Sequence, residues 1–234
     1  MENQGVSIIT CTKKPQFMEM IFNNYNNQKW DKKELIIILN RNNMRMQEYK
    51  RKASQFKNVK VFKLPETATL GACLNYGIQK AVYPYIAKFD DDDFYGARYI
   101  EEAMKTMNRV KADIVGKRAI YTFIEYKNVL LLRFSGGENK FVNFIAGGSI
   151  FMKKSVWQTV PFRNITLGED IDFLQRARKK GYKIYSSSKN HFIGIRRKNP
   201  IHHTWFPDIN YLLKTGKRIG TAQTYHALTM RFLQ

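Results

Sequence analysis

The residues most able to do chemistry form a run of four aspartates at positions 90–93, directly after an apolar segment that ends at Phe89. Such a segment is typical of a buried strand, and ligands bind open parallel sheets beyond the carboxyl ends of their strands. Adjacent carboxylates repel one another, and Mg²⁺ and Mn²⁺ bind oxygen ligands of this kind together with substrate phosphates. The run therefore predicts a metal and phosphate site. The alternative is a solvated turn that caps a helix beginning at Phe94.

A second acidic group begins a later predicted helix. Glu169 and Asp170 follow Gly168, and Phe173 belongs to the apolar stripe of that helix. The helix dipole stabilises acids in a first turn, so capping alone explains the pair. A carboxylate kept ionised beside a cleft is also what a general base needs. The residues alone leave both interpretations open.

The composition is that of a globular protein with a large excess of positive charge. The 234 residues are enough for one large domain, and 40 Lys and Arg against 19 acids give a net charge of +21. That charge indicates an anionic partner, such as phosphates, nucleic acid or a membrane face. The two cysteines form neither a metal pattern nor a disulfide framework. Since the sequence shows no secretion signal and no membrane-spanning apolar run, we expect a cytoplasmic protein.

The apolar pattern predicts alternating strands and helices. Strands are expected at residues 6–10, 34–39, 59–64 and 85–89, and helices at 15–27, 44–56 and 70–81. This order is typical of an α/β sandwich with a mostly parallel central sheet. The second half is more mixed, with helices at 97–110 and 169–180, a strand at 113–115, an antiparallel pair at 119–126 and 129–134, and an irregular basic region after Asn190. Gly147 and Gly148 indicate a turn, or a place where an acceptor approaches the backbone.

Four segments resemble the motifs of family 2 glycosyltransferases of the GT-A fold. They are residues 6–10, 70–78, 85–93 and 168–170, in that family's order and usual spacing. The resemblance implies a single GT-A domain over residues 1–234, a Rossmann-like α/β/α sandwich with a smaller antiparallel acceptor-side part. About residues 1–100 would bind the nucleotide sugar, about 101–190 would bind the acceptor and catalyse, and about 191–234 would form a basic C-terminal segment.

The resemblance also implies roles for the aspartate run. Asp90 and Asp92 match the D-x-D motif, in which the first acid helps to hold the nucleotide and the second ligates Mg²⁺ or Mn²⁺ at the diphosphate. Asp93 matches a further acid near the donor sugar, and Asp91 is assigned with it to nucleotide-sugar binding.

Further roles follow from the same resemblance. Asp170 matches the catalytic base of an inverting mechanism, and Glu169 is expected to orient the groups around it. Thr10 matches the end of the first strand, where the base and ribose dock. Asn40 departs from the pattern, because an Asp usually contacts the base at that position. A uracil N3–H can still bond to the side-chain oxygen of Asn40.

The remaining donor-site candidates are residues expected to do the work of a basic residue that the family often has and this sequence lacks. Asn75 is assigned to donor binding, but the Arg that often precedes it in the family is absent here. Arg196 and Arg197 are therefore expected to bind the diphosphate, since guanidinium groups form bidentate hydrogen bonds with phosphate oxygens. His203, with His202 as the alternative, is expected to complete the metal shell.

Together these implications predict a metal-dependent inverting glycosyltransferase. Asp170 would take a proton from an acceptor hydroxyl, whose oxygen would displace the nucleoside diphosphate from the sugar. A UDP-sugar is the expected donor and Mg²⁺ or Mn²⁺ the expected cofactor. The expected acceptor is a bacterial cell-envelope or spore-surface glycan, lipid-linked or phosphate-bearing.

Two alternatives compete with this prediction. A nucleotidyltransferase that makes a nucleotide sugar shares the sheet and the acidic site, but it usually has a Gly-rich loop after the first strand, and residues 11–15 contain no glycine. A non-enzymatic basic nucleic-acid-binding protein is suggested by charge alone. The sequence has no recognisable nucleic-acid-binding motif, and residues 90–93 would repel a phosphate backbone, so no nucleic acid is expected.

The positive charge is concentrated towards the C-terminus. From Lys179 onward, eleven Lys and Arg residues stand against one acid, Asp208. Part of this charge is expected to serve the donor phosphates. For the rest we hypothesise peripheral docking on the anionic inner membrane face or on a phosphate-bearing acceptor. The sequence leaves the oligomeric state open.

Overall fold

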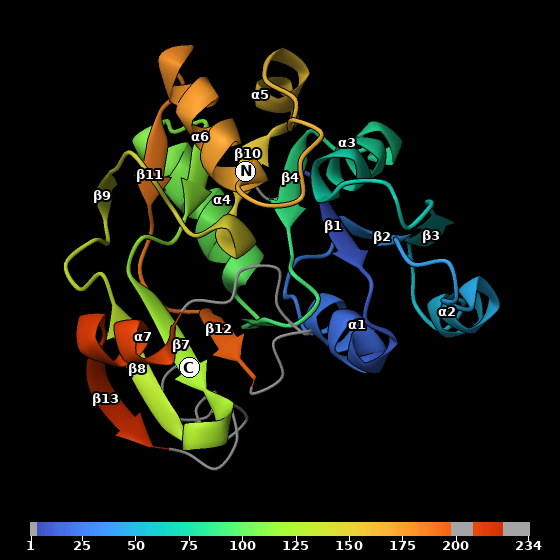
Figure 1. Cartoon of the computed structure of the whole chain (residues 1–234). Coiled ribbons are helices and arrows are strands. Elements are labelled where there is room, and N and C mark those ends of the chain that lie inside the picture. The colour runs from blue at the N-terminus through green and yellow to red at the C-terminus, as the bar shows by residue number, and fades with distance from the viewer. Residues whose placement is uncertain (1–3, 198–207, 222–234) are drawn as a thin grey trace.

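The computed structural model describes residues 4–197 and 208–221, which form two sheets flanked by helices (Figure 1). The larger sheet has the strand order β3-β2-β1-β4-β10-β6-β11-β9. Its strands are β1 (Val6–Thr12), β2 (Lys33–Leu39), β3 (Val59–Lys63), β4 (Tyr85–Lys88), β6 (Ile114–Gly116), β9 (Lys140–Phe141), β10 (Phe151–Lys153) and β11 (Ile184–Ser186).

The half of this sheet built from the N-terminal sequence is parallel. β1 pairs with β2 and with β4, and β2 pairs with β3, all in parallel. β10 then enters antiparallel between β4 and β6. Because parallel strands end at the same edge of a sheet, the residues that follow β1, β2 and β4 meet at that edge.

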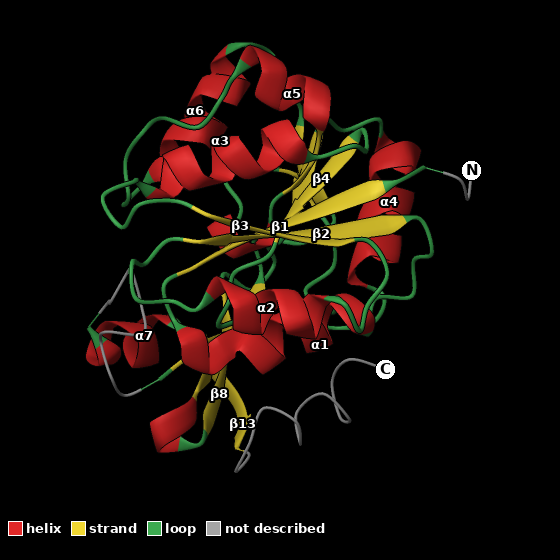
Figure 2. Ribbon diagram, turned by 90° about the vertical axis from the view of Figure 1, so that its right-hand side faces the viewer, coloured by secondary structure: helices red, strands yellow, loops and turns green. Residues whose placement is uncertain are grey.

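Alternation along the strands builds a core on each face of the sheet. Ile8 packs with α1 (Met18–Asn26), α2 (Met46–Ala53) and α4 (Tyr99–Val110). Ile9, the next residue, packs on the other face with α3 (Leu70–Lys80), α5 (Lys154–Thr159) and α6 (Glu169–Lys179). Figure 2 shows α3, α5 and α6 on one side of the strands and α1 and α2 on the other. The α/β/α sandwich predicted from the sequence is confirmed.

The smaller sheet has the order β13-β8-β7-β12-β5 and lies at the lower left of Figure 1, away from β1 to β3. Its strands are β5 (Phe94–Tyr95), β7 (Ile120–Ile124), β8 (Val129–Arg133), β12 (Phe192–Arg196) and β13 (Lys217–Thr221), with α7 (Ile209–Thr215) beside β13. β7 and β8 form the antiparallel pair that the sequence predicts. Within the part of the chain that the structure describes, no helix is long and apolar enough to cross a bilayer.

Three local expectations are corrected. The aspartate run does not cap a helix at Phe94, since that residue begins β5 and α4 starts only at Tyr99. The region after Asn190 is not irregular throughout, because β12 pairs there with β7 and β5. β1 continues to Thr12, so Thr10 lies inside the strand rather than at its end.

Candidate active site

The aspartate run lies beside the end of β1, because β1 and β4 are neighbouring parallel strands. Thr12, the last residue of β1, donates from its hydroxyl to Asp91 Oδ2 at 2.6 Å. Lys14 follows in the next turn, and its Nζ lies 2.9 Å from Asp91 Oδ1 and 2.9 Å from Asp92 Oδ2. The run therefore meets a cation and a hydroxyl from its own chain at the sheet edge.

Asp90 is held from the opposite side. Its carboxylate forms an ion pair with Lys88 of β4, and its backbone N–H donates to the Tyr95 hydroxyl at 2.8 Å. Burial disfavours the charged form of Lys88, but the carboxylates of Asp90, Glu169 and Asp170 outweigh it and raise the pKa of this lysine. Lys88 thus remains positive between the aspartate run and the acids of α6.

Two members of the run have strongly perturbed acidity. Burial raises the pKa of Asp91 to about 7, and the neighbouring charge of Asp92 acts in the same direction. Burial raises the pKa of Asp93 to about 7 as well, again with Asp92 adding to it. Asp93 Oδ1 also accepts from the backbone N–H of Ile195 at 2.9 Å, which ties the run to β12. At neutral pH the run therefore carries fewer than four negative charges.

A two-glycine turn brings the acids of α6 to the run. A Cβ on Gly147 would lie 1.9 Å from Asp170 Oδ2, and a Cβ on Gly148 would lie 2.7 Å from Asp90 Oδ2 and 3.1 Å from Asp93 Oδ2. Real Cβ atoms essentially never come within 3.0 Å of another heavy atom. The space that a side chain would need at this turn is therefore filled by carboxylates, so a larger residue at either position would force these carboxylates to shift.

The two acids of α6 differ in their surroundings. Glu169 is buried, and burial raises its pKa to about 7, opposed by the charge of Lys88. Asp170 is only half-buried, and its Oδ1 accepts from the backbone N–H of Ile171 at 2.8 Å, which leaves Oδ2 towards Gly147. Asp170 is therefore the acid of this pair that a substrate can reach.

Arg196, the last residue of β12, and Arg197, which follows it, are the predicted diphosphate ligands and also lie at the aspartate run. Arg197 donates from Nη1 to the backbone oxygen of Asp92 at 2.8 Å, and its guanidinium lies 4.4 Å from the centre of the Phe17 ring. Arg196 lowers the pKa of Asp93 through its charge, although burial dominates that carboxyl. Thr12 and Lys14 were missed in the sequence, and the available signal was a basic residue just beyond the first strand.

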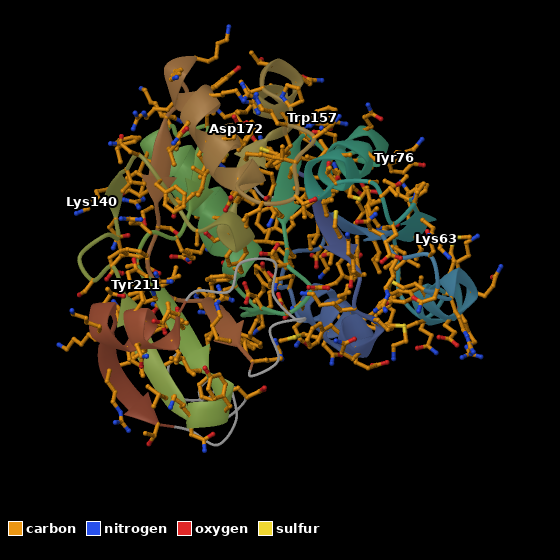
Figure 3. All side chains as sticks on the ribbon, in the orientation of Figure 1. Lys63, Tyr76, Lys140, Trp157, Asp172 and Tyr211 are labelled. Carbon is orange, nitrogen blue, oxygen red and sulfur yellow. The ribbon has the colours of Figure 1, made fainter. Side chains whose placement is uncertain are left out.

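Two other predicted donor residues are engaged within the fold. Asn75 donates to the Phe162 carbonyl at 2.8 Å, and its Oδ1 accepts from Trp157 Nε1 at 2.8 Å and from the Phe162 N–H at 3.0 Å. Trp157, labelled in Figure 3, belongs to α5. These bonds give Asn75 a structural role. Asn40 is buried and donates from Nδ2 to the Pro65 carbonyl at 2.6 Å.

The surroundings of Asp92 do not fit the Mg²⁺ or Mn²⁺ expected there. The Lys14 ammonium already occupies the space between the carboxylates of Asp91 and Asp92. Across residues 4–197 and 208–221, no three His, Cys, Asp or Glu side chains form a group suited to a metal ion. His203, the second expected ligand, lies outside the described residues, and the metal stays a prediction.

Comparison with known proteins identifies the family. The model of Glycosyl transferase family 2 matches residues 6–162, whereas no curated protein sequence matches the chain. Three crystal structures of S. aureus TarS 1-349 share the fold at 14% identity. They are the complex with UDP-GlcNAc (TM-score 0.70, 87% of this chain and 62% of that chain), the complex with UDP (0.64, 85% and 62%) and one whose name gives no ligand (0.66, 82% and 60%). The chain thus spans about three-fifths of the length of those TarS chains. Because the family match covers well over half of its residues, the protein belongs to glycosyl transferase family 2.

Proposed function

We propose that the protein transfers a sugar from a UDP-sugar to an acceptor hydroxyl. The observation that carries this proposal is the turn at Gly147 and Gly148, because the half-buried Asp170 of α6 lies against Gly147 while Asp90 and Asp93 of the run lie against Gly148. The turn therefore has the proposed base on one side and the proposed diphosphate site on the other, as a displacement reaction requires. Membership of the family supports the reaction class, and the UDP and UDP-GlcNAc complexes of TarS support the choice of donor.

The chemistry assigns one role to each side of the site. Asp170 removes the proton from the acceptor hydroxyl, and the oxygen attacks the anomeric carbon from the face opposite the diphosphate. The bond from that carbon to the diphosphate oxygen breaks, and UDP leaves with the electron pair, so the configuration inverts. Lys14 and Arg197 lie where they can offset the charge of the leaving diphosphate. No step passes through a metal.

Asn40 supports uracil as the base. Its amide nitrogen is used by the Pro65 carbonyl, which orients the side chain. The amide oxygen is then the atom left to accept from a ligand, and uracil presents an N3–H donor whereas cytosine presents an acceptor. A fixed amide thereby takes the place of the carboxylate that the family usually has there.

A thermal-shift panel tests this proposal. UDP and UDP-GlcNAc should raise the melting temperature in a concentration-dependent way, because a ligand that binds only the folded state stabilises it by mass action. ADP, GDP and CDP at the same concentrations serve as controls and should shift it less. No shift with any nucleoside diphosphate would contradict the proposal, and a shift that is equal for all four bases would contradict the role of Asn40.

We also propose that the acceptor is a cell-envelope or spore-surface glycan and that the protein docks on an anionic membrane face. The net charge of +21 supports an anionic surface or a phosphate-bearing acceptor. Sedimentation with vesicles tests the membrane part. Binding to vesicles with anionic lipid but not to neutral vesicles is expected, and equal binding to both, or to neither, would contradict it.

A further inference from the structure

We propose that the Lys14 ammonium is a resident cation at Asp91 and Asp92 of the aspartate run and that it donates to the diphosphate of the donor, in the place where a divalent metal would otherwise bind. The inference rests on the proposed function, because it concerns how the same site holds a nucleoside diphosphate. It assigns to a lysine the role that the resemblance gives to Mg²⁺ or Mn²⁺.

The donor geometry of Lys14 leaves room for a ligand. An ammonium has three N–H donors, and within residues 4–197 and 208–221 Asp91 Oδ1 and Asp92 Oδ2, each 2.9 Å away, account for two of them. The third is available to a phosphate oxygen. The side chain of Lys14 is 17% exposed against 6% and 10% for the two carboxylates, so a ligand that enters the site reaches the lysine more readily than the acids behind it.

Several contacts hold Lys14 in this position. Its backbone N–H donates to the Thr12 hydroxyl at 3.0 Å, and that hydroxyl donates to Asp91, so the turn and the run are tied together. The ammonium also lies 5.5 Å from the centre of the Phe17 ring, the ring on which Arg197 stacks. The aromatic ring thus holds two cations beside the run. The lysine is a built part of the site and not a loose surface chain.

A metal and this lysine compete for the same oxygens. A divalent ion that takes Asp92 Oδ2 must displace an ammonium at hydrogen-bond distance, and two cations at that spacing repel each other. Without Lys14, the carboxylates of Asp91 and Asp92 would lose an ammonium that lies 2.9 Å from each of them. Their oxygens are ligands of the kind that Mg²⁺ and Mn²⁺ prefer. Removal of the lysine should therefore create metal binding rather than abolish it.

Two titrations test the inference. UDP is titrated by calorimetry in EDTA and in Mn²⁺, and Mn²⁺ alone is titrated by electron paramagnetic resonance of the free ion. The wild-type protein should bind UDP in EDTA, with a Kd that Mn²⁺ changes by less than about twofold. Lys14→Met should weaken UDP binding in EDTA about tenfold or more, because a hydrogen bond to a charged group is lost. The same variant should bind Mn²⁺ where the wild type does not.

Matched variants separate this role from a folding defect. Lys52→Met removes a lysine with an equal 2.9 Å ion pair, to Glu19, outside the site, and it should change neither titration. Lys14→Arg keeps the cation and should retain UDP binding in EDTA. The wild-type titrations need no variant at all.

The outcomes are distinct. Wild-type binding of UDP only in Mn²⁺, or Lys14→Met binding UDP in EDTA as tightly as the wild type, would overturn the inference. If no nucleoside diphosphate binds under any condition, the proposed function fails, and Mn²⁺ binding to the wild type would then separately overturn the claim that Lys14 holds the metal position.

Discussion

Replacing Gly147 by alanine tests whether the base must meet the aspartate run at the two-glycine turn. The added Cβ would lie 1.9 Å from Asp170 Oδ2, whereas ordinary contact begins at 3.4 Å. The carboxylate must therefore move by about 1.5 Å, the difference between these two distances. A misplacement of about 1 Å can lower a rate about 100-fold, so we expect transfer to fall at least that far, equivalent to about 2.7 kcal/mol in the barrier.

The assay for this variant is the rate of UDP release from UDP-GlcNAc, measured together with UDP affinity. Affinity should stay close to that of the wild type, because the contacts of Lys14 with the run are not touched. Gly220→Ala is the control, since no atom lies within 4 Å of the added Cβ in β13. A Gly147→Ala protein that releases UDP at the wild-type rate would refute the role assigned to the turn.

Three further predictions concern other parts of the site. Asn75→Ala removes three hydrogen bonds and should lower the free energy of unfolding, measured by urea titration, by about 2–4 kcal/mol. UDP affinity should not change, and a loss of UDP affinity at unchanged stability would instead support a role for Asn75 in donor binding. Asn40→Leu should weaken UDP binding about tenfold by calorimetry, and unchanged binding would exclude the base contact. Burial raises the pKa of Asp93 to about 7. Between about pH 4 and 7 the folded protein therefore keeps a proton on Asp93 that the unfolded chain releases. The contribution of Asp93 to the free energy of unfolding consequently falls as the pH rises through this range. Asp93→Asn should flatten that part of the stability curve relative to wild type, and an unchanged difference between pH 5 and 7.5 would contradict the shifted pKa.

The sequence was sufficient to predict the α/β/α sandwich because its apolar residues recur with clear strand and helix periodicity. Ile36 and Ile38 face one core and Leu35 and Ile37 the other, and such a run is typical of a parallel strand that is covered on both faces. The acids at 90–93 and 169–170 could also be placed, since the first group follows the apolar segment of β4 and the second begins the periodic segment of α6.

The remaining parts of the site depend on tertiary contacts that a linear pattern does not contain. Lys14 meets Asp91 across 77 residues of sequence, and Gly147 meets Asp170 only because α6 packs against the sheet. Asn75 matched a donor motif by position, but its amide is used by Phe162 and Trp157. The short strand β12 was missed because its apolar residues, next to basic ones, resemble a loop.

Asp170→Asn most directly tests the central claim that one acid of α6 is the base for a donor held at the aspartate run. The change keeps the size of the side chain and removes its basicity. Asp172→Asn is the matched control, because Asp172 lies on the same helix (Figure 3) but is paired with Arg176 at 2.7 Å and Arg163 at 3.3 Å. In the control, UDP affinity and the rate of UDP release from UDP-GlcNAc should stay near the wild-type values.

For Asp170→Asn we predict UDP affinity within about twofold of the wild type and UDP release slower by at least about 100-fold, the contribution expected of a general base. Release at the wild-type rate would contradict the account, and so would loss of UDP binding together with activity, which would give Asp170 a binding or structural role instead.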